Sequence, residues 1–194
     1  MAVITLSRQV GSGGDEIAEG VARRLALRLV GSEIINQAAR QAGTPEVALA
    51  ALDELGLLGV KPSRDDRERY AATVAEIIRG LADNGNVLLL GRGGQVVLQE
   101  RPDVLHVRVI APFPWRARRV AEQYQLPEGA AATQLQARDQ ARAAYVQQYH
   151  GRSADDPELY AMILNTSRLD PATAVEAICR AAIQLPTWQP KERS

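Results

Sequence analysis

Glycines and acidic residues gather in one short stretch near the start of the chain, Gly11-Ser12-Gly13-Gly14-Asp15-Glu16. Consecutive glycines let backbone N–H groups approach an anion closely, and the N-terminus of a following helix adds positive partial charge. The stretch therefore has the composition of a phosphate-binding loop. A glycine-rich turn without a ligand is also common, and Asp15 and Glu16 stabilise a helix N-terminus by themselves. The loop alone leaves both interpretations open.

A second glycine-rich loop, Gly91-Arg92-Gly93-Gly94, carries an arginine and follows the apolar run Val87–Leu90. Such a run is too short for a helix and is typical of a strand buried on both faces. In open α/β sheets, ligands bind outside the carboxyl ends of the strands. Arg92 is either a surface arginine in a turn or a guanidinium that recognises phosphate or carboxylate, and its glycine neighbours favour recognition.

Arginines recur in two later helical segments. Arg116, Arg118 and Arg119 lie in the early turns of a helix opened by Phe113-Pro114-Trp115, where they oppose the helix dipole. Either an anion or a solvated basic face accounts for them. A second helix, 130–149, is rich in Ala and Gln and poor in large apolar residues, which predicts a loosely held helix. It places Arg138, Asp139, Arg142 and Tyr145 along one side. A closing lid or an exposed helix with a local Arg–Asp pair fits this pattern.

The elements that must position these residues alternate between strand and helix, which predicts a parallel sheet with helices on both faces. We expect five strands, near Val3, Leu29, Val87, Val104 and Tyr160, the last within Leu159–Leu164. Since the glycine loops follow the first and third of these strands, we expect the two loops to face one crevice.

Turn and capping residues delimit the helices. A helix from Ser32 has the apolar face Ile34, Ile35 and Ala38, a second runs from Pro45 to Leu55, and Gly56–Ser63 reads as a loop. The stripe Tyr70, Val74, Ile77, Ile78 and Leu81 predicts a helix over Arg64–Ala82. Asp170 caps a last helix that runs to about Leu185. We therefore predict one domain over 1–185, followed by a tail, 186–194, in which Trp188 docks back on the body.

Composition excludes several classes of protein. Lys plus Arg and Asp plus Glu number 23 each, so a net charge of zero gives no case for a nucleic acid polymer or an anionic membrane as partner. The single cysteine, Cys179, cannot form an internal disulfide and is expected to be a small buried residue. With two histidines far apart, a zinc site is not expected. The chain starts with a strand rather than a leader, which predicts a cytoplasmic protein.

The segments SRQVGSGGDEIA, NVLLLGRGGQVVL, PDVLHVRVIAP, RDQARAAYVQQYHG and LYAMILNTSRL together resemble the cytidylate kinase-like family, a branch of the P-loop nucleoside monophosphate kinases. The resemblance spans nearly the whole chain in the right order. It implies a three-layer P-loop NTPase-like α/β fold with a five-stranded parallel sheet, a monophosphate-side helical region at about 32–84 and a helical lid at about 126–157. It also implies transfer of the ATP γ-phosphoryl group to CMP or a related monophosphate, with Mg²⁺.

The resemblance also implies roles for individual residues. Gly11, Ser12, Gly13 and Gly14 match the loop that binds the ATP phosphates, and Arg92 matches an arginine on the monophosphate side. Arg138, Asp139 and Arg142 match the lid motif, whose arginines hold the transferring phosphoryl group. Arg116 matches the arginine that opens the helix after the fourth strand, and Tyr145 and Asn165 match family features without an assigned role.

The sequence departs from the family pattern at the phosphate loop. A P-loop has Lys and then Ser or Thr after its glycines, whereas this chain has Gly14 and Asp15. Leu90 and Gly93 replace the aspartates around Arg92, and Gly31 replaces one after the second strand. We hypothesise that Arg8 replaces the lysine and that Asp15 holds Mg²⁺ directly; no metal ligand is assigned beyond that hypothesis.

Three functions stay open from the sequence. The first is a nucleoside monophosphate kinase that uses nucleotides as substrates. The second is a nucleotide- or anion-binding protein that keeps the fold without the chemistry. The third is a structural homo-oligomer, which fits the alanine-rich helices but leaves both glycine loops unexplained.

Overall fold

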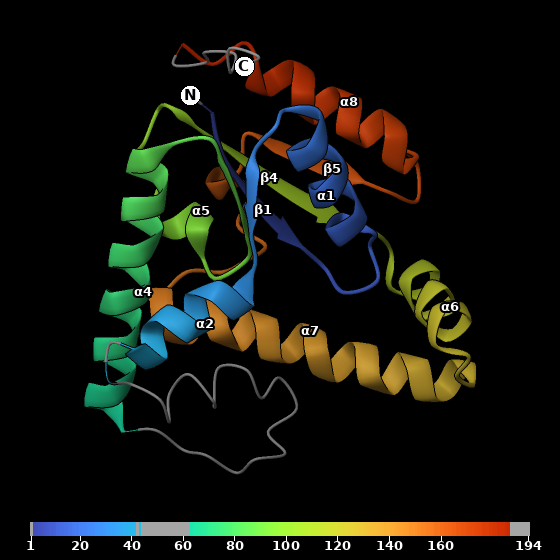
Figure 1. The fold of residues 1–194 in the computed structure, drawn as a ribbon. Coiled ribbons are helices and arrows are strands. Elements are labelled where there is room, and N and C mark those ends of the chain that lie inside the picture. Colours follow the sequence, from blue (N-terminus) through green and yellow to red (C-terminus); the bar gives the residue numbers. More distant parts are fainter. Residues whose placement is uncertain (1, 42, 44–62, 187–194) are drawn as a thin grey trace.

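Parallel strands alternate with helices along the chain, as Figure 1 shows. The computed structural model describes residues 2–41, 43 and 63–186. The sheet has five strands in the order β2-β3-β1-β4-β5, and every pairing is parallel. The strands are β1 Val3–Arg8, β2 Arg28–Val30, β3 Val87–Leu90, β4 Val104–Ile110 and β5 Met162–Asn165. The predicted α/β fold with a five-stranded parallel sheet is confirmed.

The register of the sheet sorts the side chains of the central strands onto two faces. Val3 pairs with Val87 and Val104, and two residues later Thr5 pairs with Leu89 and His106. Because side chains alternate along a strand, residues of matched register share a face. One face is apolar as far as Arg8 at the end of β1, whereas the other changes from valine to polar side chains toward the carboxyl ends of β1 and β4.

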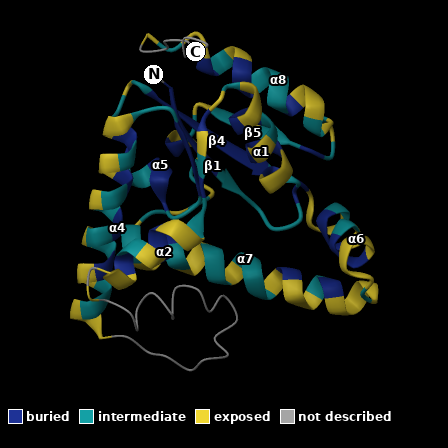
Figure 2. Cartoon of the chain, viewed as in Figure 1, coloured by how far each residue is buried: buried dark blue, intermediate teal, exposed yellow. Residues whose placement is uncertain are grey.

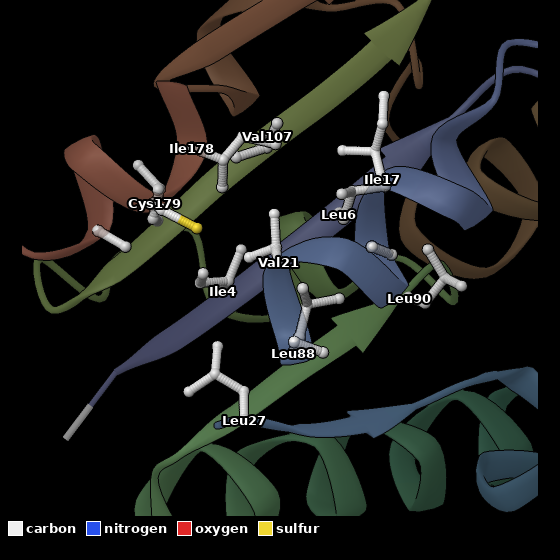
Figure 3. Packing of buried hydrophobic residues seen from close by; sticks show 14 of the residues in the cluster. Ile4, Leu6, Ile17, Val21, Leu27, Leu88, Leu90, Val107, Ile178 and Cys179 are labelled. Carbon is white, nitrogen blue, oxygen red and sulfur yellow. The ribbon is translucent and has the colours of Figure 1, made fainter. Parts of the chain in front are cut away.

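Helices α1 (Gly14–Arg24) and α8 (Pro171–Ala182) cover the apolar face. Figure 3 shows Ile17 and Val21 of α1 and Ile178 of α8 packed against Ile4 and Leu6 of β1. Cys179 lies in the same cluster and is buried, as predicted, and burial raises the pKa of its thiol. Asp170 caps α8 by accepting from the Thr173 N–H.

Helices α2 (Ser32–Gln41), α4 (Arg64–Asn84) and the short α5 (Gly94–Val97) cover the opposite face. The stripe of α4 is buried at Tyr70, Val74 and Ile78. The predicted apolar face of α2 is only partly right: Ile35 is buried, but Ile34 is exposed, and Asn36 and Ala39 are the other buried residues. The physical reason is a buried hydrogen bond from the Tyr70 hydroxyl to Asn36 Oδ1, 2.9 Å long, which turns the amide inward.

Helices α6 (Phe113–Tyr124) and α7 (Glu128–His150) lie apart from these two layers, with α7 running across the carboxyl end of the sheet (Figure 1). Figure 2 shows α7 largely exposed or intermediate along its length. Two contacts fix it: Leu135 and Ala131 pack against α6, and Tyr145 and Tyr149 pack near Tyr70 of α4. The helix has few buried apolar residues, for which the sequence predicted a loosely held helix, but it is anchored near both ends.

Several element boundaries differ from the predicted ones. The last strand starts at Met162 rather than Leu159, because Asp156 accepts from the Glu158 N–H and caps a 3₁₀ turn, Pro157–Leu159. The helix predicted over 130–149 begins two residues earlier, after Pro127. The final helix ends at Ala182. The helix predicted from Pro45 to Leu55 and the docking of Trp188 lie outside the described residues. None of the described helices combines the length and apolar composition needed to span a membrane.

Candidate functional site

A cavity of about 700 Å³ lies where the carboxyl ends of the central strands meet α7. Ser7, Arg8 and Gln9 line it at the end of β1, and the loop 90–93 lines it at the end of β3. The cavity-facing side of α7, residues 139–149, forms the opposite wall. A crevice is present at the ends of the first and third strands as predicted, but of the two glycine loops only the second lines it.

Arginine dominates the polar lining of the cavity. Five of its lining residues are arginines, and two are carboxylates. Each carboxylate already receives an arginine: Asp139 pairs with Arg116, and Asp155 pairs with Arg108. Because guanidinium groups outnumber the carboxylates that line the same space, the cavity suits an anionic ligand. The five arginines are Arg8, Arg67, Arg92, Arg108 and Arg142.

Arg8 passes between the two glycine loops. A Cβ placed on Gly14 would lie 2.5 Å from Arg8 Cβ and 2.9 Å from its Cγ. A Cβ on Gly91 would lie 2.7 Å from Arg8 Nη1. The side chain of Arg8 therefore occupies the space beside position 14, where the family's P-loop has its lysine, and its guanidinium reaches the second loop. Arg8 and a lysine at position 14 are sterically incompatible.

The guanidinium of Arg8 pairs with Asp15, the other departure from the P-loop pattern. Arg8 Nη2 and Nε donate to Asp15 Oδ1 over 2.9 and 3.2 Å. The arginine side chain is nearly buried, while the aspartate side chain is mostly exposed. Arg8, the hypothesised replacement for the lysine, is therefore in direct contact with Asp15, which replaces the Ser or Thr of the P-loop pattern.

The first glycine loop packs on α6 and on the segment between β5 and α8. Ser12 is buried, its hydroxyl donates to the Gln9 carbonyl over 2.8 Å, and the Thr166 hydroxyl donates to the Ser12 carbonyl over 2.7 Å. A Cβ on Gly11 would lie 2.9 Å from Val120 of α6. Residues 11–14 do not line the large cavity, which begins at Arg8. The loop thus holds its shape through packing and lies beside the cavity rather than in its wall.

The second glycine loop places Arg92 in the cavity by a rare backbone conformation. Gly91, Arg92 and Gly93 have φ values of 80°, 59° and 72°. A non-glycine residue in the left-handed region costs about 1 kcal/mol, and such residues concentrate at functional sites. The Arg92 guanidinium lies over the ring of Tyr145 on α7, 5.0 Å from its centroid. The loop and the helix therefore meet at this arginine.

The three residues of the predicted lid motif separate into different environments. Arg142 lines the cavity, with Nη1 3.5 Å from the Arg8 carbonyl oxygen. Asp139 also lines it, but its carboxylate accepts from Arg116 Nη1 over 2.7 Å and from the Val10 N–H over 3.4 Å. Arg138 is half-buried and does not line the cavity among the described residues. Arg142 is thus the lid arginine that faces the cavity.

Arg116 is a buried structural arginine. It donates to the carbonyls of Ala111 and Val10, over 2.8 and 3.0 Å, in addition to Asp139. It therefore ties the first loop, the start of α6 and the middle of α7 together. Arg119 pairs with Glu16 over 3.0 Å, and Arg118 is exposed. Arg116 therefore does not lie on a solvated face, and the anion that it contacts is the Asp139 carboxylate of the protein itself.

The floor of the cavity is polar and was not predicted. Arg108, on β4, donates to the Ser7 hydroxyl over 2.9 Å and pairs with Asp155. Gln95 Nε2 donates to the Tyr160 hydroxyl over 3.3 Å. The sequence did carry a signal: His106 and Arg108 interrupt an otherwise apolar strand at alternate positions. Their spacing of two places both on one face of the sheet.

Burial perturbs ionisable groups around the cavity. Burial lowers the pKa of His106, whose Nδ1 lies 2.7 Å from the Thr5 hydroxyl and whose Nε2 lies 3.2 Å from the Leu98 carbonyl. Burial also raises the pKa of Tyr145, so its hydroxyl stays protonated beside Arg92. With Tyr149 and Tyr70, Tyr145 forms an aromatic wall between α7 and α4.

Asp15 is the carboxylate beside the first loop that could bind a magnesium ion. Within the described ranges, no group of three or more His, Cys, Asp or Glu side chains could hold a metal ion. Mg²⁺ in phosphoryl-transfer sites uses one or two carboxylates together with substrate phosphates and waters. Asp15, mostly exposed and bonded to Arg8 through one oxygen, fits that donor set. Asp15 would therefore hold the ion, which supplies charge neutralisation to the phosphates.

The fold is one that kinases share. A crystal structure of an uncharacterized protein from Eubacterium ventriosum aligns with a TM-score of 0.75 at 18% identity, covering 95% of this chain and 99% of that one. A gluconokinase from Sinorhizobium meliloti aligns with a TM-score of 0.55 at 16% identity and 95% coverage of both chains. A shikimate kinase from Bacteroides thetaiotaomicron aligns with a TM-score of 0.51 at 15% identity, covering 95% and 97%.

The family follows from the sequence match. The model of the cytidylate kinase-like family matches residues 3–168, and the chain belongs to this family. The cytidylate kinase of Ignicoccus hospitalis is 26% identical over 181 residues, which cover 93% of this chain and 98% of that one. The cytidylate kinase of Methanothermobacter thermautotrophicus is 26% identical over 168 residues, covering 87% and 97%. The resemblance inferred from the motifs is therefore confirmed.

Proposed function

We propose that this chain is an ATP-dependent nucleoside monophosphate kinase that acts on CMP or a related monophosphate in the cytoplasm. Membership of the cytidylate kinase-like family supports the reaction class. The observation that carries the proposal is the position of Arg8. The base of its side chain lies beside position 14 and its guanidinium reaches Gly91, so one arginine side chain lies between the first loop and the second.

Three of the five cavity arginines have a role in this proposal. Arg8, with the amides of Gly11–Gly14, binds the ATP phosphates, and Asp15 orients Arg8 and holds Mg²⁺. Arg92 binds the acceptor phosphate from the second loop. Arg142 approaches from α7 and stabilises the transferring phosphoryl group. Phosphoryl transfer depends mainly on positioning and on neutralising charge, which a set of converging guanidinium groups supplies.

Asp139 acts as a positioning residue rather than a catalytic one. Its carboxylate is occupied by Arg116 and the Val10 N–H, so it fixes α7 to the segment that follows β1. Arg142 lies one helical turn nearer the carboxyl end of α7, and the same contact therefore sets where Arg142 meets Arg8. The proposal does not assign contact with nucleotide to Arg138.

A second function is favoured by the Arg8–Asp15 ion pair. A carboxylate that already accepts both Nη2 and Nε of Arg8 reduces the charge offered to a phosphate. A protein of this geometry that binds nucleotides or other anions without turnover would keep the cavity and lose the chemistry.

ADP formation from ATP and Mg²⁺, measured with CMP, dCMP, UMP and AMP as separate acceptors, tests the proposal. We expect acceptor-dependent ADP formation that is greatest with a pyrimidine monophosphate. Binding of ATP and CMP without ADP formation would favour the second function, and binding of neither would contradict both.

A further inference from the structure

Arg108 is a buried charge with a single acidic partner among the described residues. Its side chain is 7% exposed at the floor of the cavity, and it donates to Ser7 Oγ over 2.9 Å and to the Tyr160 hydroxyl over 3.5 Å. Both of these acceptors are neutral. The carboxylate of Asp155 completes the set. A buried guanidinium is stable only with a counter-charge. The position beside Arg108 that the Asp155 carboxylate occupies must therefore be filled by an anionic oxygen.

The present occupant of that position is a surface residue. The side chain of Asp155 is 72% exposed, although the arginine it contacts is buried. An exposed carboxylate gains little from an ion pair, because water solvates it almost as well. The Asp155 carboxylate therefore loses little free energy when it separates from Arg108, whereas the Arg108 guanidinium stays buried.

The segment that carries Asp155 does not depend on the ion pair for its position. Arg152 pairs with Asp156 over 2.6 Å, and the Tyr160 hydroxyl donates to the Ala154 carbonyl over 2.7 Å. The Asp155 N–H donates to the Ser153 hydroxyl over 3.2 Å. These contacts hold the backbone on both sides of Asp155. Its side chain can therefore turn away by rotation alone, without moving the segment.

We propose that Arg108 is a receptor for an anionic group of the acceptor, a phosphate monoester or a carboxylate, and that Asp155 occupies it only until that group arrives. The inference rests on the proposed function in placing the acceptor in this cavity, which Arg92 and Arg108 both line. Arriving oxygens exchange with the Asp155 carboxylate on the same guanidinium, so the buried charge is paired before and after binding. Asp155 thereby sets how strongly an acceptor must bind in order to enter.

Removing the competing carboxylate is the direct test. We expect Asp155→Asn to bind inorganic phosphate about threefold or more tightly than the parent, by isothermal titration, because no side-chain anion competes for Arg108. Glu158→Gln removes one negative charge from the neighbouring surface and is the matched control, with affinity unchanged. The Nε–Hε resonance of Arg108 should shift during the titration in both the parent and Asp155→Asn.

A second variant and a second anion complete the test. Arg108→Met should abolish the gain when it is combined with Asp155→Asn, and Arg108→Lys should retain part of it. Repeating the titration with acetate separates the two sources of the anionic group: a larger gain with phosphate assigns phosphate monoesters, and a larger gain with acetate assigns carboxylates.

Anion titration alone, without an assay of kinase activity, can contradict the role proposed for Arg108 and Asp155. If Asp155→Asn binds both anions no more tightly than Glu158→Gln, or if the Arg108 resonance does not move, the pair is structural and the inference is wrong. Because the titration requires no turnover, an inactive protein would contradict the kinase proposal without affecting this result.

Discussion

Arg8 and Gly14 form a coupled pair at the scale of single residues. The P-loop pattern G-x-x-x-x-G-K has its first glycine where this chain has Arg8 and its lysine where this chain has Gly14. Here the long side chain comes first and the glycine second. The contact of 2.5 Å between Arg8 Cβ and a Cβ at position 14 makes the two arrangements mutually exclusive. A cation stands near the first loop in either case, but it comes from a different position in the chain.

Restoring the lysine alone should therefore destabilise the protein. We expect Gly14→Lys to lower the free energy of unfolding by about 1–3 kcal/mol, the usual cost of overpacking, in urea titrations. Gly80→Lys is the matched control, because a Cβ at that helical position meets nothing within 4 Å; it should be neutral or stabilising. Combining Gly14→Lys with Arg8→Gly should recover most of the loss, and simple additivity of the two would argue against the coupling.

The two lid arginines give a matched comparison on one helix. Arg142 lines the cavity and Arg138, one turn earlier, does not. In the proposed kinase, Arg142→Ala should reduce kcat by about 10²-fold or more, as expected for an arginine on a transferring phosphoryl group. Arg138→Ala should change kcat by less than about threefold. Equal losses in the two variants, measured with circular dichroism to confirm folding, would remove the specific role of Arg142.

At the scale of elements, a buried ion pair joins α6 to α7 beside their apolar contact. The Arg116 side chain is 5% exposed and the Asp139 side chain is 27% exposed. Asp139→Ala leaves a buried guanidinium without its carboxylate, which should lower the free energy of unfolding by about 3 kcal/mol. Glu122→Ala, an exposed carboxylate on α6, should change it by less than about 0.5 kcal/mol. Similar values for the two variants would show that Asp139 does not support the helix.

His106 of β4, which lies beside Thr5 of β1, should make the free energy of unfolding depend on pH. Burial lowers the pKa of His106 in the folded state, while the unfolded value is about 6.5. The unfolded chain therefore binds more protons below that pH, and stability contributed by neutral His106 is present above about pH 6.5 and lost as the pH falls. The loss should reach at most about 1.4 kcal/mol per pH unit for this residue.

The experiment compares urea unfolding of the parent and His106→Gln between pH 7.5 and pH 5, roughly the interval in which a histidine titrates. The variant should show a shallower dependence. Some dependence should persist because burial also lowers the pKa of His150. An unchanged slope in His106→Gln would mean that His106 does not titrate differently on unfolding.

Element patterns were predictable from sequence where burial is uniform. The continuous apolar run of β3, the largely apolar strands β1 and β4 and the stripe of α4 each follow one physical rule, the burial of apolar side chains. Errors arose where a polar group is buried with a partner distant in sequence. The face of α2 depends on the buried hydrogen bond between Asn36 and Tyr70, which lie 34 residues apart in the chain. Local periodicity contains no information on such partners.

At the scale of the whole molecule, the zero net charge conceals a strongly uneven distribution. Arginines converge on one cavity, and most acidic side chains lie elsewhere on the surface. The glycine loops and Arg92 were predictable because they follow apolar strands in sequence. The place of Arg8 beside the first loop was hypothesised because Arg8 ends the first strand. The cavity floor around Arg108 was not predicted, because it depends on which strands are adjacent and on the register between them. Adjacency in the order β2-β3-β1-β4-β5 is a property of the assembled sheet.

The same assembly explains why distant segments act as one site. The loops after β1 and β3 adjoin because those strands pair, and α7 reaches both because α6 and α4 anchor it near its two ends. In the proposed kinase, Arg8 supplies the positive charge that a lysine supplies in other P-loops.

Titration of ATP into the parent, Arg8→Ala and Arg23→Ala by calorimetry tests that claim most directly. Arg23 is an exposed arginine of α1 and controls for the loss of one charge. A charge-assisted hydrogen bond contributes about 1.5–3 kcal/mol, so Arg8→Ala should weaken ATP binding by about tenfold or more while Arg23→Ala leaves it unchanged. ATP binding of equal strength in all three proteins would contradict the account.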